Sequence, residues 1–277
     1  MTTAVSTYRE FAAGRPFKVR ARGMARDLAV CAMGAMARPA AAGWVRFPYY
    51  HHVYDDERRG FAAQLNWMAA NGEFISLDDA VALLATGVPI DGRYWCVTFD
   101  DGLGGCRNAI AMLAERGVPA GFYLTSEFMG CMLPPGDAVA ARSFGFRGTG
   151  SGLDFLSWDE CRAAVAAGMT MGSHTTRHVA LATLDAEAVL AEMTRSRQTI
   201  ETELGQPCRH FCAPFGVPGR HYLPERDPAL ATQAGYASFA TGTRGPNRSG
   251  QNPLALRRDH LLAGWHPLQL RWFLGRP

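Results

Sequence analysis

The chain contains no run of 18 consecutive apolar residues, so the sequence predicts no membrane-spanning helix. Charged residues make up only 19% of the 277 residues, and the 30 glycines follow no three-residue period, which excludes disorder, coiled coil and collagen. The 28 Lys and Arg residues exceed the 25 Asp and Glu residues by three and are scattered along the chain. This charge pattern argues against nucleic acid as a main partner.

No pair of cysteines has Cys-x-x-Cys spacing, so neither a zinc knuckle nor a dithiol redox motif is expected. The seven cysteines are Cys31, Cys96, Cys106, Cys131, Cys161, Cys208 and Cys212. Several lie in apolar runs, where a free cysteine usually packs as a small core residue. Their odd number favours a reducing compartment, and therefore a cytoplasmic rather than a secreted protein.

The N-terminal part of the chain has few strand signals. Its apolar run at 28–37 follows Arg20, Arg22 and Arg26, an arrangement that resembles a signal peptide. The run begins late, however, and Asp27 lies at its edge, so we expect a buried or surface-docked helix instead. Residues 1–45 are therefore interpreted as an N-terminal helical extension, and 46–277 as one domain without internal repeats or linkers.

From residue 47 onward, helical and strand patterns alternate. Apolar spacing and capping residues predict helices at 57–70, 77–86, 107–116, 157–168, 185–204 and 228–234. Short β-rich runs predict strands at 94–99, 121–125, 169–172, 209–213 and 236–241. Residues 126–156 show no period and are expected to form a long loop. The alternation predicts an α/β fold with a mostly parallel sheet.

Two adjacent carboxylates, Asp100 and Asp101, follow the strand predicted at 94–99. In parallel α/β folds, ligands bind at this end of the strands. Adjacent carboxylates repel each other there, so a cation or a shared proton is needed. Taken alone, the pattern is more typical of an ordinary Asp-Gly turn with solvated side chains.

Two histidines, His174 and His178, follow the strand predicted at 169–172. At positions i and i+4 they would face the same way on a helical turn. Neutral imidazoles in that arrangement suit Zn²⁺, and an aspartate is a common third ligand that leaves positions open for water. Two surface histidines at a helix start are an equally good interpretation of this motif alone.

The two motifs together resemble those of the polysaccharide deacetylase family, carbohydrate esterase family four. The family's Thr-Phe-Asp-Asp-Gly motif matches TFDDG at 98–102, and its His-(Ser/Thr)-x-x-(x)-His motif matches HTTRH at 174–178. The stretches YYHHV at 49–53 and FAAQLNWMAANGEFISLDDA at 61–80 resemble the branch that acts on poly-N-acetylglucosamine. The resemblance extends from about residue 47 to residue 261.

This resemblance implies a distorted (β/α) barrel and metal-dependent removal of an N-acetyl group from a carbohydrate or glycoconjugate. It implies that Asp100 is the general base, and that Asp101, His174 and His178 bind a divalent metal, most often Zn²⁺, with Co²⁺ or Ni²⁺ as alternatives. The metal would lower the pKa of water and polarise the acetyl carbonyl. A backbone N–H near Phe215 would stabilise the oxyanion.

The family's third motif, Arg-x-Pro-Tyr/Phe, is incomplete in this chain. Pro214 and Phe215 match it, but Cys212 stands where the arginine that pairs with the catalytic aspartate is expected. Arg258, in LRRDHL at 256–261, resembles a later arginine of the family and is a candidate replacement. Two exposed arginines, Arg257 and Arg258, are an equally good interpretation.

A protonated histidine must deliver a proton to the leaving amine. We favour His51, in the Tyr-His-x-Val element, over His260, and expect neighbouring carboxylates to raise its pKa. His52 is expected to be structural, and His210 and His221 ordinary. Candidates for stacking on sugar rings are Trp158, Phe144, Phe146 and Tyr222, whereas Trp67 and Phe61 fit a helical core stripe.

Two alternatives remain open from the sequence. One is hydrolysis of another C–N bond, by a deformylase or ureide amidohydrolase with the same fold. The other is a metal-free sugar-binding module that has lost catalysis. Under the favoured interpretation the partner is an N-acetylated sugar or glycoconjugate inside the cell.

Overall fold

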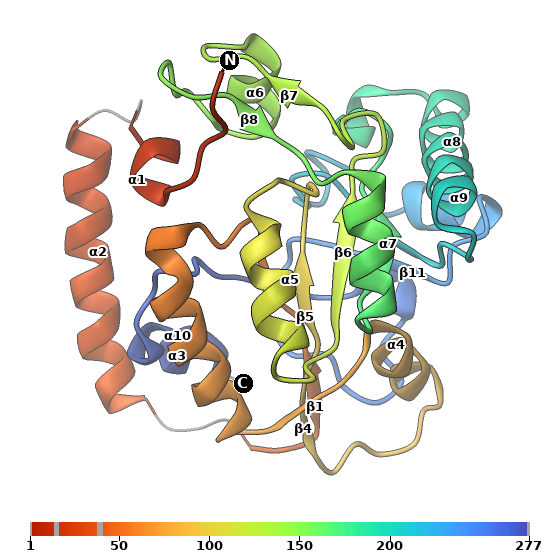
Figure 1. Ribbon diagram of the computed structural model, residues 1–277. Coiled ribbons are helices and arrows are strands. Elements are labelled where there is room, and N and C mark those ends of the chain that lie inside the picture. The colour runs from red at the N-terminus through yellow and green to blue at the C-terminus, as the bar shows by residue number, and fades with distance from the viewer. Residues whose placement is uncertain (1, 14–16, 38–40, 276–277) are drawn as a thin grey trace.

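The computed structural model describes residues 2–13, 17–37 and 41–275. Its centre is a seven-stranded sheet of order β11-β10-β9-β6-β5-β2-β12, in which every neighbouring pair is parallel. The strands are β2 (Pro48–Tyr50), β5 (Val97–Phe99), β6 (Ala120–Leu124), β9 (Thr170–Ser173), β10 (His210–Cys212), β11 (Ser238–Ala240) and β12 (Asp259–His260). The helices around the sheet include α3 (Arg58–Ala69), α4 (Leu77–Ala85), α5 (Cys106–Ala114), α7 (Trp158–Ala166), α8 (Ala186–Leu204) and α9 (Asp227–Gln233) (Figure 1). The predicted α/β architecture is confirmed.

A short segment near the C-terminus connects the two edges of this sheet. Leu256, which follows the 3₁₀ turn Pro253–Ala255, forms a parallel bridge with Ala240 of β11. Three residues later, Asp259 pairs with Pro48 of β2 at the opposite edge. Residues 256–260 therefore close the curled sheet into the distorted barrel that the family resemblance implies.

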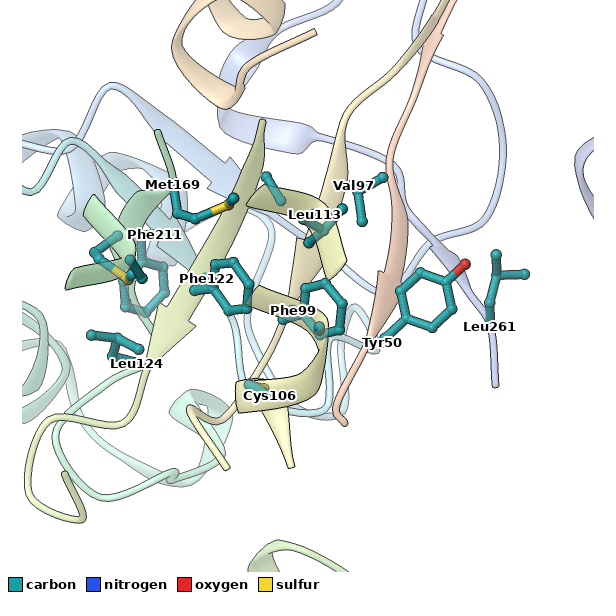
Figure 2. Packing of buried hydrophobic residues seen from close by; sticks show 14 of the residues in the cluster. Tyr50, Val97, Phe99, Cys106, Leu113, Phe122, Leu124, Met169, Phe211 and Leu261 are labelled. Carbon is teal, nitrogen blue, oxygen red and sulfur yellow. The ribbon is translucent and has the colours of Figure 1, made fainter. Parts of the chain in front are cut away.

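The barrel core consists of large side chains from neighbouring strands. The rings of Tyr50 and Phe99 stack 5.4 Å apart, and those of Phe99 and Phe122 stack 4.8 Å apart with an interplanar angle of 8° (Figure 2). Phe211 on β10 continues the same core cluster. Because both faces of a parallel sheet are covered, its strands appear in the sequence as short continuous apolar runs.

The strand predicted at 94–99 is in fact two strands that belong to different sheets. β4 (Arg93–Trp95) pairs with β1 (Trp44–Arg46) and β3 (Glu73–Phe74), whereas β5 joins the barrel. The chain changes sheets at Cys96, whose N–H donates to the Arg46 carbonyl. The prediction of one strand is wrong here because an uninterrupted apolar run does not reveal such a switch.

The segment 126–156, predicted to be a loop, contains secondary structure and shares a small core with Val5, Phe11, Tyr54 and Leu103. It forms the antiparallel pair β7 (Met132–Leu133) and β8 (Leu153–Asp154), and the short helix α6 (Ala138–Ser143). Asp137 caps α6 by accepting from the N–H groups of Val139 and Ala140. Apolar side chains of this segment pack together in a separate cluster, which includes Phe144, Phe146, Leu153 and Phe155.

The N-terminal helices α1 (Tyr8–Phe11) and α2 (Phe17–Met36) precede the barrel. α2 packs against α10 (Pro267–Leu274) so closely that a methyl group at Gly34 would lie 1.8 Å from the Leu268 carbonyl oxygen. The expected docked helix is thus present over these residues, while 14–16 and 38–40 lie outside the described residues. No described helix is long and apolar enough to cross a membrane. The division into 1–45 and 46–277 stays a prediction.

Candidate active site and metal centre

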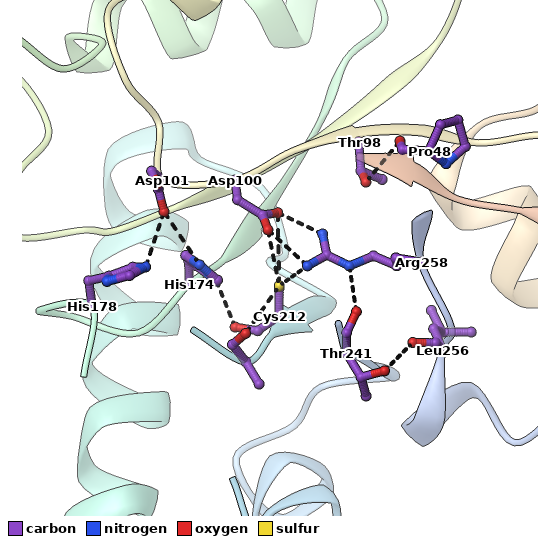
Figure 3. A network of polar contacts seen from close by, with 11 residues as sticks. Pro48, Thr98, Asp100, Asp101, His174, His178, Cys212, Thr241, Leu256 and Arg258 are labelled. Carbon is purple, nitrogen blue, oxygen red and sulfur yellow. Dashed lines mark hydrogen bonds and ion pairs between the residues drawn. The ribbon is translucent and has the colours of Figure 1, made fainter. Parts of the chain in front are cut away.

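The two adjacent aspartates follow β5 at the carboxyl end of the sheet. The Asp100 N–H donates to the Tyr50 carbonyl, which continues the strand pairing by one residue. Asp101 then has φ = 73°, and the Gly102 N–H donates to the Asp100 carbonyl at 2.9 Å, which makes a three-residue turn. Such a backbone costs about 1–3 kcal/mol in a residue other than glycine and is typical of functional sites. The turn directs the two carboxylates to different partners (Figure 3).

The HTTRH motif folds as an irregular turn, so the expected helical turn is wrong. Thr175 and His178 have φ values of 66° and 56°, in the left-handed region. Helix α8 supports this backbone: the Glu192 carboxylate accepts from the Thr176 N–H, and the Ser196 hydroxyl donates to the Thr175 carbonyl. The histidines meet because of this supported turn and not because of helical spacing.

Asp101, His174 and His178 are buried together, with ligand atoms within 4.8 Å of one another. The Asp101 Oδ1 atom lies 3.5 Å from Nε2 of His174 and 3.2 Å from Nε2 of His178. Nδ1 of His174 donates to the Cys212 carbonyl at 2.8 Å, which leaves the Nε2 lone pair directed toward Asp101. Asp101 Oδ1 is buried and accepts no hydrogen bond from the part of the chain that the structure describes. This donor set fits a divalent cation with open positions.

The charge states of these groups also suit a cation. Burial lowers the pKa of His174 to about 4, although the charge of Asp100 partly offsets this effect. Burial alone would raise the pKa of Asp101, but the neighbouring histidines, His178 foremost, reverse the shift and lower it. A neutral imidazole and an ionised carboxylate are the forms that bind metal.

Asp100 is held by Arg258, the arginine of the segment that closes the barrel. Nη1 and Nη2 of Arg258 donate to Oδ1 and Oδ2 of Asp100 at 2.7 and 2.8 Å, and Nε donates to the Thr241 carbonyl. Arg258 is only 1% exposed, so the interpretation as an exposed arginine is wrong for this residue, whereas Arg257 is exposed. Burial raises the pKa of Asp100, but the Arg258 guanidinium outweighs it and lowers the pKa.

Cys212, which stands at the position of the motif arginine, lies beside this ion pair. Its sulfur accepts from Nη2 of Arg258 at 2.9 Å and lies 3.8 and 3.9 Å from the Asp100 oxygens. Asp100, His174 and Cys212 form a second group with metal-binding atoms. This group suits a cation less well, because Arg258 occupies both Asp100 oxygens and burial strongly raises the pKa of the thiol.

Both candidates for the general acid lie near the aspartates. His51 lines the same cavity as Asp100 and Asp101, and the ring of His260 lies 5.1 Å from the His51 ring. Asp101 and Asp100 act to raise the pKa of His51, as expected, but burial outweighs them and lowers it. Burial, and after it the neighbouring His51, lower the pKa of His260 to about 3.

The aspartates and histidines open into a cavity of about 330 Å³. It is lined by Tyr49, His51, Asp100, Asp101, Ser143, Phe144, His174, His178, Ala213, Phe215, His221 and Arg258. His221, interpreted as ordinary from the sequence, is therefore part of the site, whereas His210 is not among the lining residues. No sequence motif marked His221, because it reaches the cavity through the irregular loop after β10.

Of the aromatic residues proposed to stack on sugars, only Phe144 lines this cavity. Phe146 and Tyr222 are buried in the protein core, and Trp158 packs against the main core cluster. The structure therefore corrects the prediction for these three residues. Phe61 is fully buried and Trp67 packs against the core, as their helical spacing predicts.

Phe215 is 44% exposed at the cavity and has φ = 61°. The Gly216 N–H donates to the Pro214 carbonyl at 2.7 Å, which makes a second three-residue turn like that at Asp101. Pro214 itself is buried and does not appear among the lining residues. No hydrogen bond within the described part of the chain uses the Phe215 N–H. This donor is therefore available to a ligand.

Comparisons with known proteins identify a matching family model and solved structures with a similar fold. The family model described as polysaccharide deacetylase matches residues 87–237. The structure of IcaB from Ammonifex degensii aligns with 86% of this chain and 100% of its own, at 22% identity and a TM-score of 0.70. The Streptococcus pyogenes deacetylase PplD aligns with 86% of this chain and 100% of its own, at 18% identity and a TM-score of 0.67. The BpsB deacetylase domain from Bordetella bronchiseptica covers 81% of this chain and 98% of its own, at 18% identity and a TM-score of 0.62. No curated protein matches the chain in sequence.

Proposed function

Because the chain belongs to the polysaccharide deacetylase family, we propose that it hydrolyses the N-acetyl group of a carbohydrate or glycoconjugate, with a divalent cation bound by Asp101, His174 and His178. One observation carries this proposal: the two adjacent carboxylates have different partners. Asp100 pairs with Arg258, whereas Asp101 faces two histidines and has an oxygen that accepts no hydrogen bond from the described residues. The arrangement separates a base from a metal ligand.

A cation at this centre would polarise the acetyl carbonyl and lower the pKa of water, and Zn²⁺ is the metal that we propose. Asp100 is the base in this scheme. Its carboxylate stays ionised because Arg258 offsets the cost of burial, so it can accept a proton from the attacking water. Arg258 also fixes the orientation of both Asp100 oxygens.

The Phe215 N–H is proposed to donate to the oxygen of the tetrahedral intermediate. The turn at 214–216 holds this group at the cavity wall before substrate binds. A preorganised donor of this kind needs no rearrangement during the reaction, which is the reason that it lowers the barrier.

His51 is proposed to protonate the leaving amine, because its side chain lies on the cavity wall beside both aspartates. An amine expelled without a proton is too basic to leave. Burial lowers the pKa of His51, so its protonated form is a stronger acid than an ordinary imidazolium. The ring of His260 lies 5.1 Å from that of His51, and His260 is not among the lining residues.

The test is acetate release by the purified, Zn²⁺-loaded protein from a panel of N-acetylated sugars, with poly-N-acetylglucosamine oligomers included. We expect release from at least one N-acetylated sugar, and release about 10²–10⁴-fold slower from the Asp100→Asn variant. A folded, metal-loaded protein that releases no acetate from any of them would contradict the proposal.

We also propose a cytoplasmic location; cell fractionation that recovers the protein outside the cytoplasm would refute it.

A further inference from the structure

His174 and His178 differ in what holds their rings in place. Nδ1 of His174 donates to the Cys212 carbonyl, which fixes both its tautomer and its orientation. Nδ1 of His178 is buried and has no hydrogen-bond partner among the residues that the structure describes. Histidines that bind metals usually donate their second nitrogen to a carboxylate, a carbonyl or water, and loss of that partner costs about 10–100-fold in metal affinity. Among the described residues, contacts other than a hydrogen bond at Nδ1 are therefore what can orient His178.

Two phenylalanine rings contact the His178 imidazole. The Phe215 ring centroid lies 4.6 Å from it in an edge-to-face arrangement, and the Phe144 ring centroid lies 5.0 Å from it at a tilt of 40°. Such ring pairs prefer specific geometries and contribute about 0.5–1.5 kcal/mol beyond the area that they bury. We infer that Phe144 and Phe215, here called the aromatic support, position His178 in place of a hydrogen bond at Nδ1.

The aromatic support is itself held firmly. Phe144 ends helix α6 and packs edge-to-face against Phe128 and Phe155, with ring centroids 5.3 and 5.0 Å away. It thus belongs to the small core that segment 126–156 shares with the N-terminal residues Val5 and Phe11, and not to the barrel core. Through Phe144, the segment therefore supports one side of the proposed metal centre. It also explains why Phe144 is buried and offers little ring surface to a sugar.

Phe215 is held by its own backbone turn and by the ring of His221. Its backbone lies in the turn closed by Gly216 and Pro214, and its ring lies 5.1 Å from the ring of His221. His221 is anchored in turn, because its Nδ1 accepts from the Val217 N–H and its carbonyl accepts from the Ala182 N–H. His178, Phe215 and His221 therefore form a connected series of rings along the cavity.

This inference rests on the proposed role of His178 as a metal ligand, so its test measures metal binding and not turnover. Zn²⁺ affinity of the metal-free full-length protein is measured by competition with a chelator, and the visible spectrum of the Co²⁺ form reports ligand geometry. We expect Phe144→Ala and Phe215→Ala each to weaken Zn²⁺ binding about 10-fold and to change the Co²⁺ spectrum. Phe215→Tyr keeps the ring, and its exposed position accommodates the hydroxyl, so wild-type affinity is expected.

Val217→Ala is the matched control, because Val217 lies in the same loop, is also 44% exposed and has no ring contact with His178. It should leave Zn²⁺ affinity unchanged. If Phe144→Ala fails to fold, Phe144→Leu keeps most of the volume without a ring and should show the same loss. Wild-type affinity and an unchanged Co²⁺ spectrum in folded Phe144 and Phe215 variants would overturn the aromatic support. A wild-type protein that binds neither metal would overturn the metal centre itself.

Discussion

Removal of the Arg258 guanidinium is the perturbation with the largest expected consequence. Arg258 and Asp100 are each at most 3% exposed and share two hydrogen bonds of 2.7 and 2.8 Å. Breaking a buried ion pair by removing one partner typically costs 3–5 kcal/mol, because the remaining charge is left without compensation. Arg258 also lies 4.1 Å from the Tyr49 ring, and this contact is lost as well. We therefore expect Arg258→Met to lower the free energy of unfolding by about 3–5 kcal/mol.

The same substitution should change the pH dependence of catalysis. Arg258 lowers the pKa of Asp100 below 3.8, so the base is ionised throughout the neutral range. Without Arg258, burial dominates and raises the pKa of Asp100, so the acidic limb of the rate profile should move to higher pH. Because folding lowers the pKa of Asp100, ionisation of Asp100 stabilises the folded state. In the wild type, the contribution of ionised Asp100 is complete above about pH 4 and is lost as the pH falls through the folded-state pKa.

Chemical denaturation at several pH values and acetate release against pH measure both effects. Arg257→Met is the matched control, because Arg257 is adjacent in sequence but exposed. The double variant Asp100→Asn, Arg258→Met should be more stable than Arg258→Met alone, since it removes the uncompensated charge. The reasoning is refuted if Arg258→Met unfolds like Arg257→Met and its acidic limb does not move.

Three further predictions concern the metal centre and the proton transfers. His174→Ala should lose bound Zn²⁺ and activity while the far-UV circular dichroism stays native; full metal occupancy by elemental analysis would contradict its role as a ligand. Asp100→Asn should keep the metal and lose about 10²–10⁴-fold in turnover, whereas joint loss of metal would make Asp100 a ligand. His51→Ala should keep metal and substrate binding but reduce kcat, and His260→Ala should have a smaller effect. The opposite order in steady-state kinetics would place the general acid at His260.

The candidate site residues that the structure brings together belong to short motifs that follow buried strands. TFDDG and HTTRH each place their side chains at the carboxyl end of a strand, and strands β5 and β9 both flank β6 in the sheet. The position of Asp101 beside His174 and His178 therefore follows from local pattern and parallel topology. The backbone conformations of the motif could not be predicted in the same way, because the residue types Thr175 and His178 do not favour a positive φ.

Contacts between distant parts of the chain could not be predicted from the sequence. Arg258 meets Asp100 across 158 residues, and it does so because residues 256–260 close the barrel between β11 and β2. A two-residue strand such as β12 has too few positions to show a period of two. The Phe144 contact with His178 depends likewise on a small core in which segment 126–156 packs against Val5, Phe11, Tyr54 and Leu103.

The turn at Asp101 explains how neighbouring aspartates can have separate roles. In an extended strand, consecutive side chains point to opposite faces, and one of the two carboxylates would enter the apolar core or the helix layer. The positive φ of Asp101 ends the strand and keeps both carboxylates at the open end of the barrel. There, Asp100 meets the guanidinium of Arg258, and Asp101 meets the two imidazoles (Figure 3). Arg258 thus counters the charge of Asp100, the proposed cation would counter that of Asp101, and the strained backbone is what makes this separation possible.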